Sequence, residues 1–378
     1  MKNYILIFLL CIYAFAKAQE TTTNTGNIQI HDEGQIGFHG DLINNGNFDN
    51  NKGLAGFYND DESLSISGTN EPVFFDMEVA VDNDLVLNVS TGVTGILDYI
   101  NGRILTPRGE NSIFLDFTND AIYTGEDDDR HTDGYARNRS NLAFTFPIGD
   151  DFRLRSLSTS ATAQGDFKAA YFFEDPNNPT AFGDFDTDRF EPLLSIVSTK
   201  EFWDLDGDKT TQATLTWDDL SDIPVLADDI SSLRVVGFDS AQDRWVDLGQ
   251  TTVTGDLQGG SITSEPFIPN TYEALTFGSL LKGNGSIDVY TIITPNGDGM
   301  NDTLIIEGIG TNSENVLHIY NRWGVEVYRK VSYDNSFSGI SSGRSSVRAQ
   351  SELPVGTYYY VLKLEGQKDI AGAFYINR

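Results

Sequence analysis

From residue 27 to about residue 123, the chain carries single apolar side chains between turns rich in glycine and asparagine. The spaced apolar positions are Ile36, Phe38, Leu42, Phe48, Phe57 and Ile66. Glycine and asparagine tolerate positive φ angles, so such a chain can turn sharply every few residues. Short strands joined by these turns predict a small parallel β-solenoid over residues 19–134, although no strict repeat length is present. A loosely paired antiparallel sandwich is the alternative interpretation.

A more conventional alternation of apolar and polar residues follows, over residues 135–281. Its strand-like segments are LAFTFPIG, FKAAYFF, ATLTWDD, LRVVGFD, RWVDLG and ALTFGSL. Turn signals separate these segments at spacings typical of a β-sandwich, so we expect an immunoglobulin-like or jelly-roll domain. The stretch 282–286, which reads KGNGS, is predicted to be a flexible linker.

The last segment, residues 287–378, has the pattern of a second, smaller β-sandwich. Val316–Tyr320 and Val325–Tyr328 flank the tetrapeptide NRWG, which predicts a β-hairpin. Apolar side chains fall on both faces of a later strand at 358–364. Helical periodicity is nearly absent from the chain. The predicted fold class is therefore all-β, with a solenoid-like region, a central sandwich and a small immunoglobulin-like terminal sandwich.

The amino terminus has the features of a secretory signal peptide. A basic start and an apolar run to Phe15 precede the small-residue site at 16–18, and residues 1–18 are predicted to be removed. The alternative is a lipoprotein signal at Cys11, although Leu10 stands where lipidation needs a small residue. Because the sequence has one cysteine, the mature chain is expected to form no disulfide. No other apolar run reaches the ~20 residues of a membrane helix, so we expect no direct membrane insertion.

The amino-acid composition of the chain is strongly acidic. The chain has 56 Asp and Glu against 25 Lys and Arg, and its formal net charge is −31. Nucleic acids and anionic lipids are bound by clusters of Lys and Arg, so this balance argues against both as partners. An acidic surface keeps an exported protein soluble and can attract divalent cations.

Two acidic segments have the composition of calcium sites. Carboxylate and amide oxygens suit Ca²⁺, and glycines in the first segment free the backbone to wrap an ion. Neither segment has the glutamate that closes an EF-hand loop, and an Asx-rich turn that caps its own backbone is the alternative. The predicted ligands are Asn296, Asp298, Asn301 and Asp302 in the first segment and Asp204, Asp206 and Asp208 in the second.

Catalytic motifs are sparse. The four histidines are scattered, and the chain has no H-E-x-x-H, no G-x-S-x-G and no glycine-rich phosphate loop before a helix. We therefore expect no enzyme activity. Trp203, Trp217 and Trp245 can in principle stack on sugar rings, but their strand-like contexts favour packing in a core.

Four ordered motifs stand in the terminal segment: TPNGDGMND, VLHIYNRWGVEVY, YDNSFSG and LPVGTYYYVLKL. Together they resemble the type B C-terminal sorting domain, also called the gliding motility-associated C-terminal domain, of Bacteroidetes proteins. One position departs from the family pattern, because Phe337 stands where the N-x-W-x-G element usually has tryptophan. The resemblance covers about a quarter of the chain.

The resemblance implies Sec export followed by passage through the type IX secretion translocon with its shuttle proteins. The chain would end at the cell surface, associated with the outer membrane, or outside the cell. Tails of this type often depend on an outer-membrane β-barrel of the PorP/SprF family. Two tripeptides, at 239–241 and 302–304, also look like the O-glycosylation sequon of this phylum. The residues concerned are Arg322, Trp323, Tyr375 and Arg378 for contact with the translocon or partner, and Ser240 and Thr303 for glycosylation.

Many carriers of such tails are adhesins. The predicted function is thus a short adhesin or a gliding-associated surface component held by a barrel partner. A secreted carbohydrate-binding protein or hydrolase accessory is the alternative.

Overall fold

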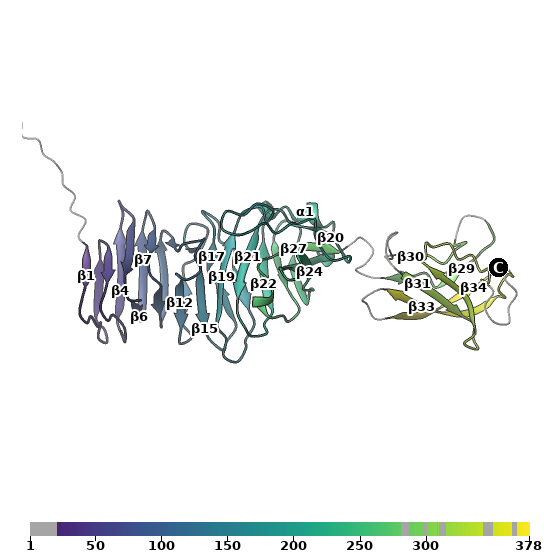
Figure 1. Ribbon diagram of the computed structural model, residues 1–378, viewed down its shortest axis with the longest axis horizontal. Coiled ribbons are helices and arrows are strands. Elements are labelled where there is room, and N and C mark those ends of the chain that lie inside the picture. The colour runs from purple at the N-terminus through teal and green to yellow at the C-terminus, as the bar shows by residue number, and fades with distance from the viewer. Residues whose placement is uncertain are drawn as a thin grey trace, which may run out of the picture. The chain divides into compact units, whose positions relative to one another are not determined.

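The computed structural model describes residues 21–280, 287–297, 301–307, 309, 315–342, 351–364 and 369–378. The predicted signal peptide 1–18 and linker 282–286 lie outside these residues. The described chain is almost entirely β-structure, as predicted (Figure 1). Its helices are single turns: η1 (Asp219–Ser221), α1 (Ile223–Leu226), η2 (Ile230–Ser232) and η3 (Pro269–Thr271). Within the described ranges, none has the length and apolar character needed to cross a membrane.

The chain folds into two compact units. Unit 1 contains the residues up to Ser140 and the segment Pro147–Leu154, and unit 2 contains Asn141–Phe146 and Arg155–Arg378. The predicted boundary at residues 134 and 135 therefore falls inside unit 1. Strands β15 (Ala136–Arg139) and β17 (Ile148–Gly149) pair with earlier strands of that unit. These strands are too short to show an alternation of apolar and polar residues in the sequence. The predicted and observed boundaries differ for this reason.

Unit 1 is a parallel β-solenoid. Its strands form three groups, and every neighbouring pair within a group is parallel, which confirms the solenoid over the antiparallel sandwich. The first group is β1 (Thr22–Asn24), β3 (Leu42–Asn44), β5 (Leu64–Gly68), β8 (Leu85–Leu87), β11 (Ile104–Leu105), β14 (Thr132–Asp133) and β17. The second is β2 (Gln35–Phe38), β4 (Leu54–Asn59), β7 (Asp76–Val81), β10 (Ile96–Asn101) and β13 (Ile122–Thr124). The third is β6 (Val73–Phe74), β9 (Thr91–Val93), β12 (Leu115–Thr118) and β15.

Asparagine and glycine join successive coils of the solenoid. The Asn24 side-chain amide donates to Asn44 Oδ1 at 2.7 Å, and the Asn44 amide donates to the Asn70 carbonyl at 2.9 Å. Gly68 has a φ of +121°, and a Cβ there would lie 2.1 Å from the Asn44 carbonyl oxygen. The glycine therefore permits both the turn and the close approach of the next coil. Inside, phenylalanine rings of successive coils stack on one another, as Phe38 and Phe57 do with centroids 4.9 Å apart.

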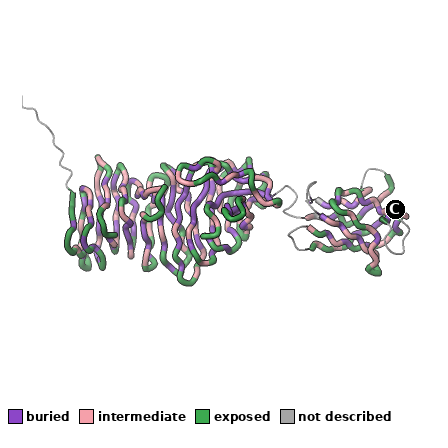
Figure 2. Tube along the Cα trace, in the orientation of Figure 1, coloured by how far each residue is buried: buried purple, intermediate pink, exposed green. Residues whose placement is uncertain are grey.

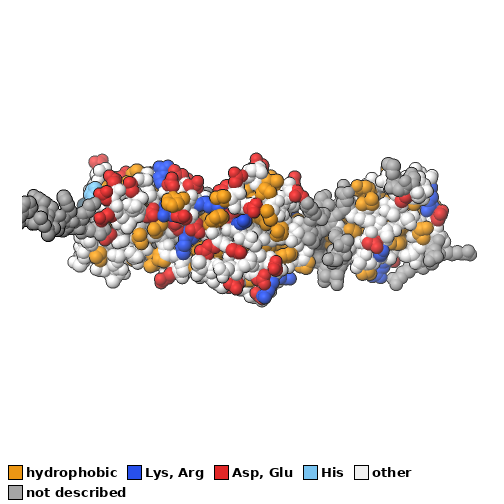
Figure 3. Space-filling view, turned by 90° about the horizontal axis from the view of Figure 1, so that it is seen from above, with side chains coloured by type: hydrophobic (Ala, Val, Ile, Leu, Met, Phe, Trp, Pro, Cys, Tyr) orange, Lys and Arg blue, Asp and Glu red, His pale blue; other side chains and the backbone are white. Residues whose placement is uncertain are grey.

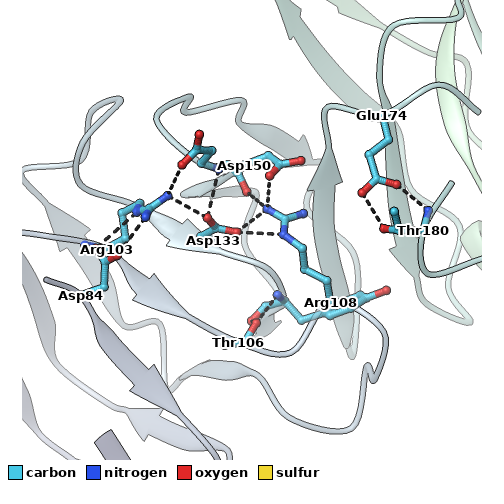
Figure 4. Close-up of polar contacts among 11 residues, drawn as sticks. Asp84, Arg103, Thr106, Arg108, Asp133, Asp150, Glu174 and Thr180 are labelled. Atoms are coloured by element: carbon cyan, nitrogen blue, oxygen red, sulfur yellow. Dashed lines mark hydrogen bonds and ion pairs between the residues drawn. The ribbon is translucent and has the colours of Figure 1, made fainter. Parts of the chain in front are cut away.

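Charged side chains link the turns of the later coils (Figure 4). Asp133 accepts hydrogen bonds from the guanidinium groups of both Arg103, at 3.0 Å, and Arg108, at 2.9 Å. Arg103 also donates to Asp84 at 2.9 Å, and Arg108 forms an ion pair with Asp150 at 3.0 Å. Each arginine thus bridges carboxylates from different coils. Elsewhere, acidic side chains are spread over the face of the molecule drawn in Figure 3.

The central part of unit 2 is a β-sandwich, as predicted. One antiparallel sheet has the order β16 (Phe144–Phe146), β18 (Leu157–Thr159), β22 (Ala213–Trp217), β26 (Gly260–Thr263) and β25 (Thr252–Gly255). The other has β19 (Phe167–Phe172), β21 (Phe202–Asp206), β27 (Leu275–Leu280), β23 (Leu233–Asp239) and β24 (Arg244–Asp247), and β20 (Leu194–Val197) also pairs with β27. Phe277 contacts Trp203 within its own sheet and Trp217 from the opposite sheet. Trp203, Trp217 and Trp245 are all buried, so none presents a ring for a sugar.

In its described residues, the carboxyl-terminal domain has one five-stranded sheet and one short strand pair. The sheet has the order β29 (Ile292–Ile293), β34 (Ile370–Ile376), β33 (Gly356–Leu364), β31 (Asn315–Tyr320) and β32 (Glu326–Val331). The pair is β28 (Asp288–Val289) with β30 (Ile306–Glu307). Val289 and Ile306 share a core with Leu317 and Leu362 of the sheet, so the two layers enclose one hydrophobic interior. Buried positions follow the strands of this domain in Figure 2.

Candidate functional site

The predicted hairpin of the terminal domain presents an exposed arginine–tryptophan pair at its turn. The Asn321 side-chain oxygen accepts hydrogen bonds from the backbone N–H groups of Trp323, at 3.0 Å, and Val325, at 3.1 Å. Gly324 supplies the positive φ, +76°, that closes the turn. Trp323 is 72% exposed, and the Arg322 guanidinium lies 4.2 Å from its ring centroid. The stacked pair is therefore held in place by its own turn and faces outward.

One face of the five-stranded sheet is open and carries apolar and aromatic side chains. Tyr375 on β34 pairs with Ile292 on β29, and Tyr359 on β33 pairs with Tyr320 on β31. Tyr359 is 49% exposed, whereas its neighbours Tyr358 and Tyr360 are buried on the other face. The His318 ring stacks on Tyr320 with centroids 6.3 Å apart. We call Ile292, Tyr375, Tyr359, Tyr320 and His318 the open aromatic face.

The hairpin turn and the open aromatic face meet at one end of the sheet. Tyr320, the last residue of β31, pairs with Tyr359, so the following turn at 321–324 lies at the end of the sheet where β33 begins. Tyr375 pairs with Thr357 at that same end. The register thus brings three predicted contact residues, Arg322, Trp323 and Tyr375, to one region. Exposed aromatic and arginine side chains are the usual anchors of protein interfaces.

Sequence reasoning missed part of this surface. Tyr359 is not among the contact residues predicted from the sequence. Alternation along β33 directs its side chain outward while Tyr358 and Tyr360 point inward. The period of two in the run 358–360 was the available signal. Pairing with Tyr320 across strands, in contrast, depends on register and is not visible in the sequence.

Arg378, the fourth predicted contact residue, makes its hydrogen bonds inside the domain. Its guanidinium donates to the carbonyls of Leu353, at 2.9 Å, and Gly339, at 3.3 Å, and lies 3.2 Å from the Glu352 carboxylate. These contacts tie two loops to the end of the chain. A role for Arg378 in docking stays a prediction.

Phe337, the position that departs from the family pattern, is a core residue of the terminal domain. Its side chain is buried, and its ring lies 4.7 Å from the Tyr328 ring and 5.9 Å from the Phe374 ring. The backbone N–H of Phe337 also donates to the Tyr333 hydroxyl at 3.2 Å. The departure from the family pattern therefore leaves an aromatic core intact.

The acidic segments make several contacts of their own. Asp302 Oδ1 accepts hydrogen bonds from the backbone N–H groups of Asn296, at 3.0 Å, and Gly297, at 2.7 Å, while Asn301 has a φ of +53°. Asp298 lies outside the described residues. This capping is the Asx-turn pattern, and one Asp302 oxygen is used in it. Calcium binding by this segment stays a prediction.

The three carboxylates of the second acidic segment have separate surroundings. Asp204 is buried on β21, Asp206 pairs with Lys168 at 3.2 Å, and Asp208 pairs with Lys209 at 3.2 Å. Among the described residues, no three His, Cys, Asp or Glu side chains form a group that could hold a metal ion.

The two predicted glycosylation residues differ in exposure. Ser240 is exposed in the turn between β23 and β24, where the Asp239 carboxylate accepts from the Ala241 N–H at 2.9 Å. Thr303 is half-buried beside Asp302. Modification of either residue stays a prediction.

Comparison with known families gives one match. Residues 287–376 match CHU_C, the type IX secretion signal domain. No curated protein and no solved structure gave a significant match to the chain. The matched range coincides with the carboxyl-terminal domain described above, which carries the exposed hairpin turn and the open aromatic face. The chain is therefore a cargo of the type IX secretion system with a C-terminal sorting domain, which interacts with the secretion machinery and directs export to the cell surface or beyond.

Proposed function

We propose that this protein is a short adhesin or gliding-associated surface component of a Bacteroidetes cell. In this proposal its terminal domain is of type B and docks on an outer-membrane β-barrel of the PorP/SprF type, which holds the chain at the surface. The supporting observation is the stacked Arg322–Trp323 pair beside the open aromatic face of a secretion signal domain.

The exposure of these side chains favours a lasting partner. Trp323 is 72% exposed, and Ile292 and Tyr375 are 54% and 42% exposed on the same domain. Apolar side chains in water are unfavourable, and contiguous exposed apolar patches commonly mark interfaces. A barrel partner that covers the hairpin turn and the adjoining face would remove this surface from water and hold the chain at the outer membrane.

Binding rather than catalysis is the proposed role of the mature chain. Three histidines are engaged within the fold. His131 is buried, His318 Nδ1 lies 2.8 Å from the Glu326 carboxylate, and the His39 ring packs beside the Tyr58 ring. These contacts are of the kind that structural histidines make, and the proposal assigns the three side chains no part in a reaction.

Affinity purification from outer-membrane extracts tests the anchoring. With a tag placed after Ala18, the full-length protein should recover a β-barrel of the PorP/SprF type, and a chain that ends at residue 286 should not. Trp323→Ala should weaken recovery of the barrel, with an expected loss of about 2 kcal/mol, or roughly thirtyfold in affinity. Because Trp323 is exposed, the substitution should leave the melting temperature of the protein unchanged.

Ile122→Ala is the matched control. Ile122 is an exposed apolar side chain, 55% exposed on β13, outside the carboxyl-terminal domain. Its substitution should not change barrel recovery. Quantitative release of the wild-type protein into the medium, with no membrane partner, would contradict the proposal.

A further inference from the structure

Unit 2 contains a cleft outside the carboxyl-terminal domain. It has a volume of about 370 Å³, within the size range of small-molecule sites. Three elements line it: β20, which we call its floor, and the loop at 187–190 and the helical turn α1, which we call its first and second walls. Its lining is Thr187, Asp188, Phe190, Ser195–Lys200, Ser221, Asp222, Val225 and Leu226.

The first wall is fixed by backbone pairing. Phe190 forms a parallel bridge with Trp245, which is fully buried. On either side of Phe190, the Trp245 N–H donates to the Arg189 carbonyl at 2.8 Å, and the Glu191 N–H donates to the Trp245 carbonyl at 3.0 Å. The Phe190 ring, which is half-buried, therefore projects from a rigid segment.

Hydroxyl groups join the floor to the second wall. Ser195 Oγ on β20 lies 3.0 Å from Ser279 Oγ on β27, and the Ser279 hydroxyl donates to the Leu226 carbonyl of α1 at 2.7 Å. Both walls are thus held before any ligand arrives. A preformed site loses little conformational entropy on binding, which favours affinity for a small ligand.

The mouth of the cleft combines an ion pair with apolar side chains. Lys200 Nζ lies 3.5 Å from Asp222 Oδ2, and the two side chains are 47% and 45% exposed. Val225, beside them, is 64% exposed. The cleft therefore offers a donor, an acceptor and apolar surface within one small volume.

This chemistry narrows the class of ligand. An anionic ligand would approach a chain with a formal charge of −31, and the one lysine in the lining is already paired with Asp222. An added peptide strand is disfavoured because β20 has four residues and an irregular register between Leu194 and Ile196. A neutral sugar fits better. Its C–H faces can pack on Phe190, Ile196 and Val225. Its hydroxyls can donate to the Asp222 carboxylate and accept from the Lys200 ammonium.

We infer that this cleft binds a short neutral saccharide. The inference goes beyond the proposed function, because anchoring through the carboxyl-terminal domain requires no sugar. The aromatic ring in this site is Phe190. The three tryptophans considered for sugar stacking in the sequence are buried and take no part.

Saturation-transfer NMR on purified residues 19–378 tests the inference. The probes are cellobiose, xylobiose, mannobiose and di-N-acetylchitobiose, each at millimolar concentration. At least one should receive saturation from the wild-type protein. Val225→Glu places a charged side chain at the mouth and should weaken that binding by at least about tenfold. Asp222→Asn keeps the side-chain size, removes the carboxylate and should weaken it as well.

Leu220→Glu is the matched control for Val225→Glu. Leu220 is 61% exposed close by in the sequence but does not line the cleft, so the same change should leave sugar binding intact. The inference is overturned if no probe receives saturation, or if Val225→Glu and Asp222→Asn both bind as the wild type does. It is equally overturned if Leu220→Glu weakens binding as much as Val225→Glu. The assay uses purified protein without membranes, so its failure would leave the barrel partner untested and the anchoring proposal standing.

Discussion

Asp133 joins two arginines in the later coils of the solenoid, and its removal is predicted to destabilise unit 1. Arg103 and Arg108 both donate to its carboxylate, and the Asp151 N–H donates to it at 3.0 Å. In Asp133→Ala these three donors lose an acceptor in a largely buried setting. We expect the free energy of unfolding of unit 1 to fall by about 2 kcal/mol, below the cost of breaking a fully buried pair because Arg108 is partly exposed.

Hydrogen exchange followed by mass spectrometry suits this measurement. All four tryptophans lie in unit 2, so tryptophan fluorescence would not report on unit 1. Peptides that cover β11 and β14 should lose protection in Asp133→Ala. The control is Asp151→Asn, because the Asp151 side chain is 75% exposed and its ion pair with Arg103 should contribute less than about 0.5 kcal/mol. Asparagine also tolerates the positive φ of 53° at this position. Equal protection in both variants would contradict the prediction.

His131 should make unit 1 sensitive to acid. The ring is fully buried, and its Nε2 has no hydrogen-bond partner among the described residues. Burial lowers the pKa of His131, and nearby Arg103 and Arg108 act in the same direction. The hydrogen bond to the Asp127 backbone and the charge of Asp133 oppose this shift. The folded state therefore binds fewer protons than the unfolded chain. Stability is complete above the unfolded pKa of about 6.5 and falls as the pH drops toward the lower folded pKa.

His131→Gln should remove this part of the acid sensitivity. Pulse proteolysis in urea, read on fragments of unit 1, gives stability at pH values above and below that of free histidine. The difference between the wild type and the variant isolates the histidine from the carboxylates, which are common to both. If the difference in stability between the wild type and His131→Gln does not change with pH, His131 does not cause the acid sensitivity of unit 1.

At the scale of elements, the segment from Asn296 to Asp302 carries the prediction of calcium binding. If the segment holds an ion, a chelator should lower the melting temperature of the terminal domain, and Asp298→Ala should abolish that effect. Asp302→Ala is expected to destabilise the domain with or without chelator, because Asp302 caps the N–H groups of Asn296 and Gly297. Identical calorimetric melting curves with and without chelator would count against an ion.

The elements show where sequence reasoning succeeds and where it stops. Asn24, Asn44 and Gly68 signal turns through their own backbone preferences, so the solenoid was predictable. The NRWG hairpin was predictable for the same reason, since Asn321 and Gly324 are turn residues. Local chemistry of this kind needs no knowledge of the rest of the fold.

Contacts between distant residues were not predictable. Phe190, Lys200 and Asp222 meet at one cleft only because β20, α1 and the loop at 187–190 pack together. Likewise, Tyr375 reaches Ile292 through a parallel pairing between the first and last strands of the sheet. Such neighbours are set by topology and register, and no spacing in the sequence encodes them.

For the whole molecule, the terminal domain should be both necessary and sufficient for export. A chain that ends at residue 286 lacks the matched signal domain and is expected to remain in the periplasm. Residues 287–378 fused to a periplasmic reporter should bring that reporter to the cell surface. Surface labelling of intact cells measures both. Labelling of the truncated protein at wild-type levels would contradict the first expectation, and an unlabelled fusion would contradict the second.

The parallel pairing of the solenoid has a consequence for how the protein folds during export. Thr22 pairs with Leu42, Leu42 pairs with Ile66, and Leu64 pairs with Leu85, so each new coil pairs directly with the coil just before it in the sequence. Contacts of low sequence separation form quickly, and stacked repeats can propagate from one end. A chain that emerges amino terminus first can therefore fold vectorially, adding one coil at a time, while its sorting signal at 287–378 is still to come.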